Sequence, residues 1–253
     1  MGGALVKGLL RAKVCKAADI TVTSKPATDA KKLADETGVS LAATNAAAVK
    51  KADVVVLCVK PNDAPDALKS CAKELAGKLL ISIAAGLRIE RLEALATSTR
   101  VIRVMPNTAA MVGKSATAIA CGETATDADR RAAEKIFRAV GKVFFVSENQ
   151  MDAVTGLSGS GPAFVYLAME ALSDGGVAAG LPRPLATELA IETVAGAAEM
   201  ARGAHPALLR EMVTSPAGTT SAGLRRLEKA AVRSAFAEAI VFAAERSREL
   251  SKG

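Results

Sequence analysis

The chain has 253 residues, of which 50% are hydrophobic, only 3% are aromatic and none is tryptophan. This length suffices for two domains of moderate size, whose cores must be filled by alanine, valine, leucine and isoleucine. The formal net charge is +7, but basic and acidic residues alternate along the chain and form no basic block, which is typical of a solvated surface. With 1 tyrosine and 6 phenylalanines there are few rings for bases to stack on, so we expect no nucleic-acid binding.

Metal, disulfide and membrane signals are also missing. The 4 cysteines are far apart without a CxxC pair, and His205 is the only histidine. Zinc spacing and a histidine-dependent nucleophile are therefore not expected, and unpaired cysteines favour a reducing compartment. The longest uncharged run, residues 153–169, contains glycines and Pro162, which excludes a membrane span, and no signal peptide opens the sequence. We expect a cytoplasmic protein without a metal.

Up to residue 146, segments with helical and with strand character alternate. Apolar spacing predicts helices over residues 1–14, 28–37, 45–51, 65–76, 89–97 and 127–140. Runs of apolar and β-branched residues predict strands over residues 20–23, 39–42, 53–59, 79–84, 101–104, 115–120 and 142–146. The run at 53–59, DVVVLCV, is continuously apolar, as in a strand buried on both faces. The alternation predicts an α/β Rossmann-type, doubly wound and mainly parallel sheet.

From about residue 149 the predicted strands cease. Helices are expected over residues 162–177, 184–201 and 222–250. We therefore divide the chain into an α/β domain, residues 1–148, and an all-α domain, residues 149–253. Helices this rich in alanine and glycine pack closely against each other or against a second subunit.

Four of the predicted strands end in small, polar or helix-breaking residues. They are followed by SK at 24–25, KP at 60–61, AAG at 84–86 and MPN at 105–107. Each is by itself consistent with a simple turn, but in an open parallel sheet ligands bind at the carboxyl ends of the strands. An NAD site usually has Asp or Glu at the end of the second strand, where this chain has Ser24 and Lys25. A hydroxyl and a cation at that place predict NADP.

The stretch VTSPAGTT, residues 213–220, has the character of a loop that leads into a helix. The first turn of such a helix has unpaired N–H groups and a partial positive charge, so a carboxylate or phosphate could bind to Gly218, Thr219 and Thr220. In the alternative interpretation, Thr219 or Ser221 merely caps the helix.

Six motifs in this order and spacing resemble those of pyrroline-5-carboxylate reductases. They are VKP at 59–61, AAG at 84–86, MPNT at 105–108, LSGSGPAF at 157–164, GLPRPLA at 180–186 and VTSPAGTT at 213–220. The resemblance extends from Met1 to about Leu250. It implies reduction of 1-pyrroline-5-carboxylate to L-proline with NADPH, or with NADH, as the last step of proline biosynthesis. It also implies a homodimer or a larger homo-oligomer built by the C-terminal helices.

Carried over by position, the resemblance assigns residues to both ligands. The cofactor would be lined by Gly2, Ser24, Lys25, Asn45, Val59, Lys60, Pro61, Ala84, Ala85 and Asn107, with Glu148 near it. The substrate would be held by Ser215, Gly218, Thr219 and Thr220. Hydride transfer to a C=N bond needs the imine carbon near the nicotinamide and a proton for the nitrogen, but neither a metal nor a histidine. We expect the hydroxyl of Thr220, the predicted catalytic group, to hydrogen-bond the ring nitrogen.

The sequence departs from the family pattern in two places. Ala217 stands where the loop usually has a glycine, which requires only a backbone conformation that alanine can adopt. At the start, Met1-Gly2-Gly3 resembles only the end of the GxGxxG fingerprint, so that Gly2 corresponds to its third glycine. The first strand, normally central in the sheet, is missing, and a gap between unpaired strand edges is expected. A start assigned too late, a shortened chain or a neighbouring segment in the gap would each explain this, and we favour a fragment or a misassigned start.

Two other functions stay open on the sequence alone. One is a related Rossmann reductase of another small imine or oxo acid. The other is a shortened, inactive chain that serves only as a helical oligomerisation partner. Oxidation of NADPH with 1-pyrroline-5-carboxylate, oxidation with other substrates only, and absence of cofactor binding would distinguish the three.

Overall fold

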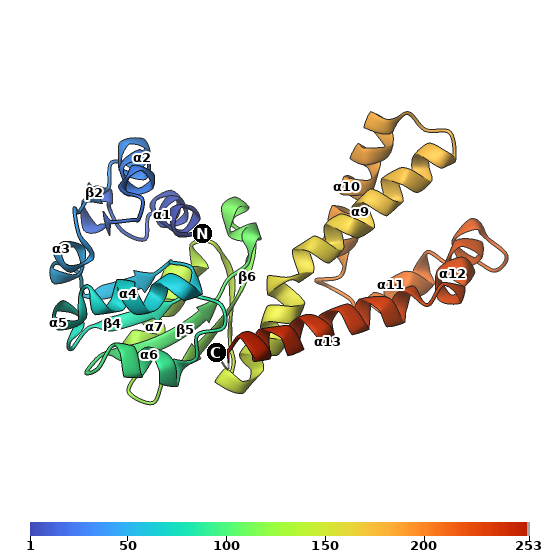
Figure 1. The fold of residues 1–253 in the computed structure, drawn as a ribbon. Coiled ribbons are helices and arrows are strands. Elements are labelled where there is room, and N and C mark those ends of the chain that lie inside the picture. Colours follow the sequence, from blue (N-terminus) through green and yellow to red (C-terminus); the bar gives the residue numbers. More distant parts are fainter. Residues whose placement is uncertain (252–253) are drawn as a thin grey trace. The chain divides into compact units, whose positions relative to one another are not determined.

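A five-stranded sheet forms the centre of the α/β region (Figure 1). The computed structural model describes residues 1–251. The strands are β3 (Val54–Leu57), β4 (Leu79–Ser82), β5 (Arg100–Met105), β6 (Ser115–Cys121) and β7 (Gly141–Phe145). They lie in the order β3–β4–β5–β6–β7, and every neighbouring pair is parallel except β5 with β6. The predicted Rossmann-type, mainly parallel sheet is therefore confirmed.

The remaining two strands form a separate small sheet. Strands β1 (Thr21–Val22) and β2 (Ser40–Leu41) pair in parallel with each other. Within residues 1–251, β1 pairs only with β2 and β3 pairs only with β4, so one edge of each has no strand beside it. The expected gap in the sheet is present. Val54, Val55 and Val56 of β3 are only half-buried, since this strand borders the gap. The prediction that the run at 53–59 is buried on both faces is therefore wrong.

Side chains of β4, which lies between β3 and β5, alternate between two apolar cores. Leu80 packs in one core with Leu68 and Leu92, which come from the helices over one face of the sheet. Ile81 packs in the other core with Phe137 and with apolar side chains of the first helix. The helices that contribute to the two cores are α1 (Gly2–Arg11), α3 (Asn45–Lys50), α4 (Ala64–Lys69), α5 (Ala72–Leu75), α6 (Ile89–Leu95) and α7 (Asp127–Arg138). Helix α2 (Ala27–Thr37) connects the two strands of the small sheet. Helices thus cover both faces, as the apolar pattern predicts.

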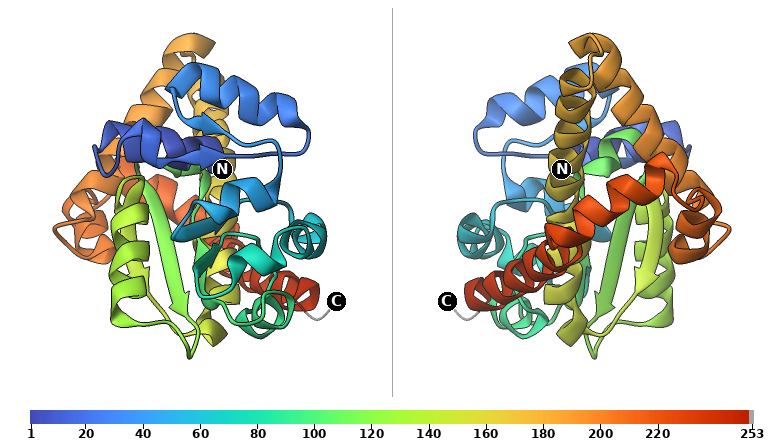
Figure 2. Two further views of the ribbon diagram at one scale, coloured as in Figure 1. Left: turned by 90° about the vertical axis from the view of Figure 1, so that its left-hand side faces the viewer. Right: turned by 90° about the vertical axis from the view of Figure 1, so that its right-hand side faces the viewer.

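The rest of the chain is helical. Its elements are α8 (Met151–Val154), a π-helical turn η5 (Thr155–Gly159), α9 (Gly161–Ala178), α10 (Arg183–Met200), α11 (Pro206–Met212), α12 (Thr219–Lys229) and α13 (Val232–Leu250). Helices α9 and α10 pack side by side as a hairpin (Figure 2, yellow and orange). None of the helices within residues 1–251 is long and apolar enough to cross a membrane.

Two predicted helices are broken in the structure. The helix predicted over 65–76 is interrupted between α4 and α5, where the Ser70 hydroxyl donates to the carbonyl of Ala67 and Cys71 leaves the helical conformation. The helix predicted over 222–250 is divided into α12 and α13, because Ala231 has a φ of 53° in the left-handed region. The second break therefore depends on a conformation that alanine rarely adopts.

By their internal packing, the described residues form two units. One contains residues 1–160 together with the residues from Phe242 onward, and the other is Gly161–Val241. The second half of α13 therefore belongs to the same packing unit as the Rossmann-type sheet. The division of the sequence at 148/149 stays a prediction about its domains.

Candidate functional site

The predicted cofactor residues lie at the carboxyl ends of the parallel strands. Strands β3, β4 and β5 are consecutive neighbours in the sheet and run in the same direction. Val59–Pro61, Ala84–Ala85 and Asn107, which follow them, are therefore brought to one edge of this sheet. This is the edge at which open α/β sheets bind ligands.

The start of α1 lies against the same edge. Helix α1 begins at Gly2, and a Cβ atom there would lie 3.2 Å from the Cβ of Cys58, just after β3. A larger residue at this position would be crowded. No side chain caps this ten-residue helix. Its first N–H groups and partial positive charge thus face the end of the strand, where an anion can bind.

Ser24, Lys25 and Asn45 surround the small sheet, but their side chains are used differently. The Ser24 hydroxyl accepts a hydrogen bond of 2.8 Å from the N–H of Ala30 and so fixes the start of α2. The amide of Asn45 donates to the hydroxyl of Ser70 over 2.9 Å. Lys25 is exposed and forms no ion pair within residues 1–251. The side chains of Ser24 and Asn45 are thus used within the protein, whereas the ammonium group of Lys25 is available for a ligand.

Asn107 has one amide atom without a partner. Its Nδ2 donates to the carbonyl of Ser158 over 3.1 Å, which joins the end of β5 to the π-helical turn η5. Its Oδ1 is enclosed and accepts no hydrogen bond within the described chain. A buried amide oxygen without a donor is unfavourable, so this atom suits a ligand that offers an N–H group.

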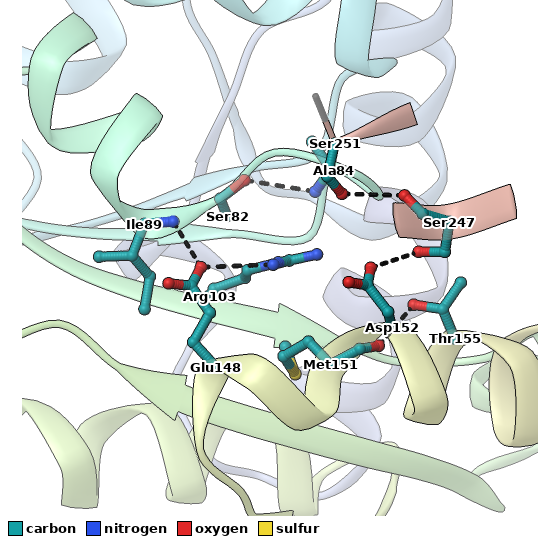
Figure 3. A network of polar contacts seen from close by, with 10 residues as sticks. All are labelled: Ser82, Ala84, Ile89, Arg103, Glu148, Met151, Asp152, Thr155, Ser247 and Ser251. Atoms are coloured by element: carbon teal, nitrogen blue, oxygen red, sulfur yellow. Dashed lines mark hydrogen bonds and ion pairs between the residues drawn. The ribbon is translucent and has the colours of Figure 1, made fainter. Parts of the chain in front are cut away.

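Glu148 is held by two groups of the protein (Figure 3). Its Oε1 accepts a hydrogen bond of 2.6 Å from the N–H of Ile89, the first residue of α6, and lies 3.3 Å from Nη1 of Arg103. Arg103 is buried in β5, and this ion pair compensates its charge. The carboxylate also lies at the positive end of α6. The position of Glu148 near a cofactor stays a prediction, while its structural contacts are clear.

The predicted substrate residues lie at the start of α12. Gly218 is the N-cap, and no side chain makes a capping hydrogen bond. The alternative that Thr219 or Ser221 caps this helix is therefore wrong. A Cβ atom on Gly218 would lie 2.3 Å from the Oγ of Ser215, which would have to turn away, so the turn is closely packed at this residue. No acidic residue lies in the first turn, and the positive end of the helix is left for an external anion.

Ala217, in the same loop, has a φ of 55°. This is the left-handed region, which costs an L-residue about 1–2 kcal/mol and is readily adopted by glycine. Ala217 therefore adopts the conformation that the sequence analysis required of it, at this cost. The turn is formed at the expense of local strain.

The histidine and the cysteines are the groups for which the sequence indicated no chemical role. Nδ1 of His205 accepts a hydrogen bond of 3.2 Å from the N–H of Ala207 and caps α11. The 4 cysteines are unpaired. No group of three or more His, Cys, Asp or Glu side chains within residues 1–251 could hold a metal ion.

Two buried polar contacts escaped the sequence reasoning. One is the pair of Arg103 and Glu148, for which the only signal was a charged residue inside the apolar strand RVIRVM. The other joins Asp152 to Ser247, 95 residues apart in the chain. No local pattern could reveal the second contact.

Comparisons with known proteins agree with this geometry. The sequence model for pyrroline-5-carboxylate reductase dimerisation matches residues 148–250, and a model described as NADP oxidoreductase, coenzyme F420-dependent, matches residues 1–86. A pyrroline-5-carboxylate reductase of Methanosarcina acetivorans is 46% identical over 256 residues, which cover 100% of this chain and 95% of that protein. The chain belongs to the pyrroline-5-carboxylate reductase family.

Solved structures of the family have the same fold. A pyrroline-5-carboxylate reductase from Coxiella burnetii superimposes with a TM-score of 0.92 at 36% identity, covering 99% of this chain and 94% of that one. The enzyme from Plasmodium falciparum, solved with NADP bound, gives a TM-score of 0.88 at 31% identity with the same coverage. The predicted family and the predicted order of a Rossmann-type region and a helical region are thereby confirmed.

Proposed function

We propose that this chain reduces 1-pyrroline-5-carboxylate to L-proline with NADPH, the final step of proline biosynthesis. The observation that carries the proposal is the 46% identity to a pyrroline-5-carboxylate reductase over the whole chain. Two groups of the Rossmann-type unit support it, because both suit groups of a nicotinamide dinucleotide phosphate: exposed Lys25, which forms no ion pair within residues 1–251, and the buried Oδ1 of Asn107, which accepts no hydrogen bond there.

The residues at the strand ends fit this cofactor. Lys25, with no carboxylate beside it at the end of β1, would hold the 2′-phosphate, so NADPH is preferred while NADH remains usable. The start of α1 at Gly2 would face the pyrophosphate. The enclosed Oδ1 of Asn107 would accept a hydrogen bond from the nicotinamide carboxamide. Bound NADPH supplies the hydride, and Val59–Pro61 and Ala84–Ala85 form the surface on which it lies.

The loop before α12 would bind the substrate. The uncapped N–H groups that follow Gly218 suit the carboxylate of 1-pyrroline-5-carboxylate, and Ser215 borders the same turn. Half-buried Thr220, in the first turn of α12, would hold the ring nitrogen through its hydroxyl. Its hydrogen bond would fix the orientation of the C=N bond and stabilise the charge that develops on the nitrogen.

The assembly we infer is a homodimer or larger homo-oligomer through the C-terminal helices. Large apolar side chains are exposed along α9 and α10, including Tyr166, Leu167, Leu185 and Leu189. A second copy of this surface would bury them. We also place the enzyme in the cytoplasm, in keeping with cysteines that form no disulfide.

Replacement of Thr220 tests the catalytic role. Thr220→Ala removes the hydroxyl, and we expect kcat with 1-pyrroline-5-carboxylate to fall by about tenfold to a hundredfold. Thr220→Ser retains the hydroxyl and should keep most of the activity. NADPH affinity should be the same in both variants, since this residue is not assigned to the cofactor.

Three outcomes would contradict parts of the proposal. Unchanged turnover in Thr220→Ala would refute the role of the hydroxyl. Oxidation of NADPH with other imines or oxo acids only would overturn the substrate. If the unaltered chain bound no cofactor, the function would be that of an oligomerisation partner.

A further inference from the structure

The end of α13 packs against the Rossmann-type sheet. The residues from Phe242 onward belong to the same unit as residues 1–160. Along the C-terminal half of the helix, Ala244 and Ser247 are buried, whereas the exposed side chains include Val241 and Leu250. One face of the last turns is therefore covered by the unit that contains the predicted cofactor edge.

A buried hydrogen bond fixes this position. Oγ of Ser247 donates to Oδ1 of Asp152, in α8, over 2.7 Å (Figure 3). Both residues are almost fully enclosed, with 5% and 6% of their surface exposed. A buried carboxylate is costly unless it receives hydrogen bonds, so the contact selects one position of α13 among those that apolar packing alone would allow.

The same turns of α13 cover the loop after β4. A Cβ atom on Gly86 would lie 3.6 Å from the carbonyl oxygen of Leu250 and 3.7 Å from its Cβ. Gly86 has a φ of +80° and directly follows Ala84 and Ala85, which we assign to the cofactor. Within the loop, the N–H of Ala84 makes a long hydrogen bond of 3.3 Å to Oγ of Ser82.

We propose that the end of α13 positions the loop Ala84–Gly86 for the cofactor, and that Ser247 and Asp152 are the positioning residues that hold it there. The inference rests on the proposed cofactor role of this loop. Two alanines and a glycine have no long side chains to fix their own backbone, and Gly86 is conformationally free. Support by α13 keeps the loop in its binding conformation before the cofactor arrives, which increases the apparent affinity.

Ser247→Ala removes the donor and is the first test. We expect the dissociation constant and the KM for NADPH to rise by about threefold to tenfold, while kcat at saturating NADPH stays within about twofold of the parent value. A loss of fold would instead lower the apparent kcat through the amount of active enzyme and leave the KM for NADPH unchanged. Asp152→Asn retains Oδ1 as an acceptor, so it should keep NADPH binding within about twofold of the parent.

Two further variants separate positioning from general destabilisation. Leu250→Gly, at an exposed residue, removes the Cβ next to Gly86 and frays the last turn, and it should also raise the KM for NADPH. Ser234→Ala is the matched control. Ser234 lies on the exposed part of the same helix, where its hydroxyl contacts only Glu238, and its loss should change nothing.

Hydrogen exchange of the free protein tests the positioning without any cofactor. In Ser247→Ala and Leu250→Gly, amides of residues 84–86 should exchange at least about threefold faster, while those of β6 keep their protection. Unchanged exchange in the loop together with unchanged NADPH affinity would overturn the inference. If the unaltered chain bound no NADPH, the proposed function would fail, and exchange in the loop would still decide whether α13 holds it.

Discussion

The two sheets of the Rossmann-type unit differ in burial, although both lead to residues of the proposed cofactor site. All of β4, Leu79–Ser82, is buried, whereas β1 is half-buried and β2 is exposed. The difference arises because β1 does not pair with β3 within residues 1–251. The small sheet therefore consists of a single strand pair, β1 with β2. Two paired strands of two residues each add little stability on their own.

We therefore expect the stability of the fold to depend mainly on the five-stranded sheet and the choice of cofactor to depend on the small sheet. The five-stranded sheet has cores on both faces and carries most of the folding free energy. The small sheet carries Lys25, the residue that we assign to the 2′-phosphate. Substitutions in the large sheet should therefore affect folding first, and substitutions around the small sheet should affect the choice of cofactor first.

The largest loss of stability is expected at Gly141, the first residue of β7. It pairs with Ser115 of β6, has a φ of +154°, and a Cβ atom there would collide with the backbone of Ser115. Gly141→Ala should lower the free energy of unfolding by roughly 3–5 kcal/mol. Urea titration at one protein concentration measures this effect.

Gly77→Ala is the matched control. Gly77 also has a positive φ, of +75°, but a Cβ atom added there would have no other atom within 4 Å. Only the backbone penalty of about 1–2 kcal/mol remains at this position. Equal losses for the two variants would show that the pairing of β6 with β7 contributes less than we infer.

A smaller effect is expected at Asp129, which joins α7 to the large sheet. Its carboxylate caps α7 through Thr126 and pairs with Arg100 of β5 over 2.7 Å. Burial raises the pKa of Asp129, but the hydrogen bonds from Arg100 and Thr126 outweigh this effect and hold the pKa below its ordinary value. The stabilisation is therefore complete above the unfolded pKa of about 4 and is lost as the pH falls through the lower folded pKa.

Asp129→Asn should lower the free energy of unfolding by about 1–2 kcal/mol at pH 7, as for the loss of a cap and a charged hydrogen bond. The difference from the parent should shrink as the pH falls below about 4, because the unfolded chain then binds a proton at Asp129 that the folded protein takes up only at lower pH. Urea titrations at pH 7 and pH 3 measure both. Asp127→Asn, at an exposed residue of the same turn, should change stability by less than about 0.5 kcal/mol. A difference that persisted unchanged at pH 3 would contradict the electrostatic explanation.

The sequence predicted the mainly parallel sheet well, because it depends on local signals. The run LLISIA contains β4, and the apolar spacing over residues 127–140 predicted the helix that the structure shows as α7. The convergence of the strand ends follows from the parallel arrangement alone. These features need no knowledge of distant contacts.

What the sequence could not predict depends on tertiary context. Alanine is the best helix former, yet Ala217 and Ala231 adopt left-handed conformations that interrupt the chain around α12. The contact of Ser247 with Asp152 joins residues that share no local pattern. In the candidate site, only the structure revealed that Glu148 is bound to Arg103 and that Oδ1 of Asn107 is unsatisfied.

The smallest change in stability, and the most selective change in binding, is expected at Lys25. Because its side chain is exposed, Lys25→Glu should leave the free energy of unfolding within about 0.5 kcal/mol of the parent value. It should weaken NADPH binding by tenfold or more and NADH binding far less, since only NADPH has the 2′-phosphate that the new carboxylate would repel. Lys31→Glu, at an exposed lysine on α2 that we do not assign to the cofactor, makes the same charge change and is the control in fluorescence titrations with both cofactors. Equal losses for NADPH and NADH would remove the selectivity role from Lys25, and a marked loss of stability would show that the small sheet supports the fold more than its burial indicates.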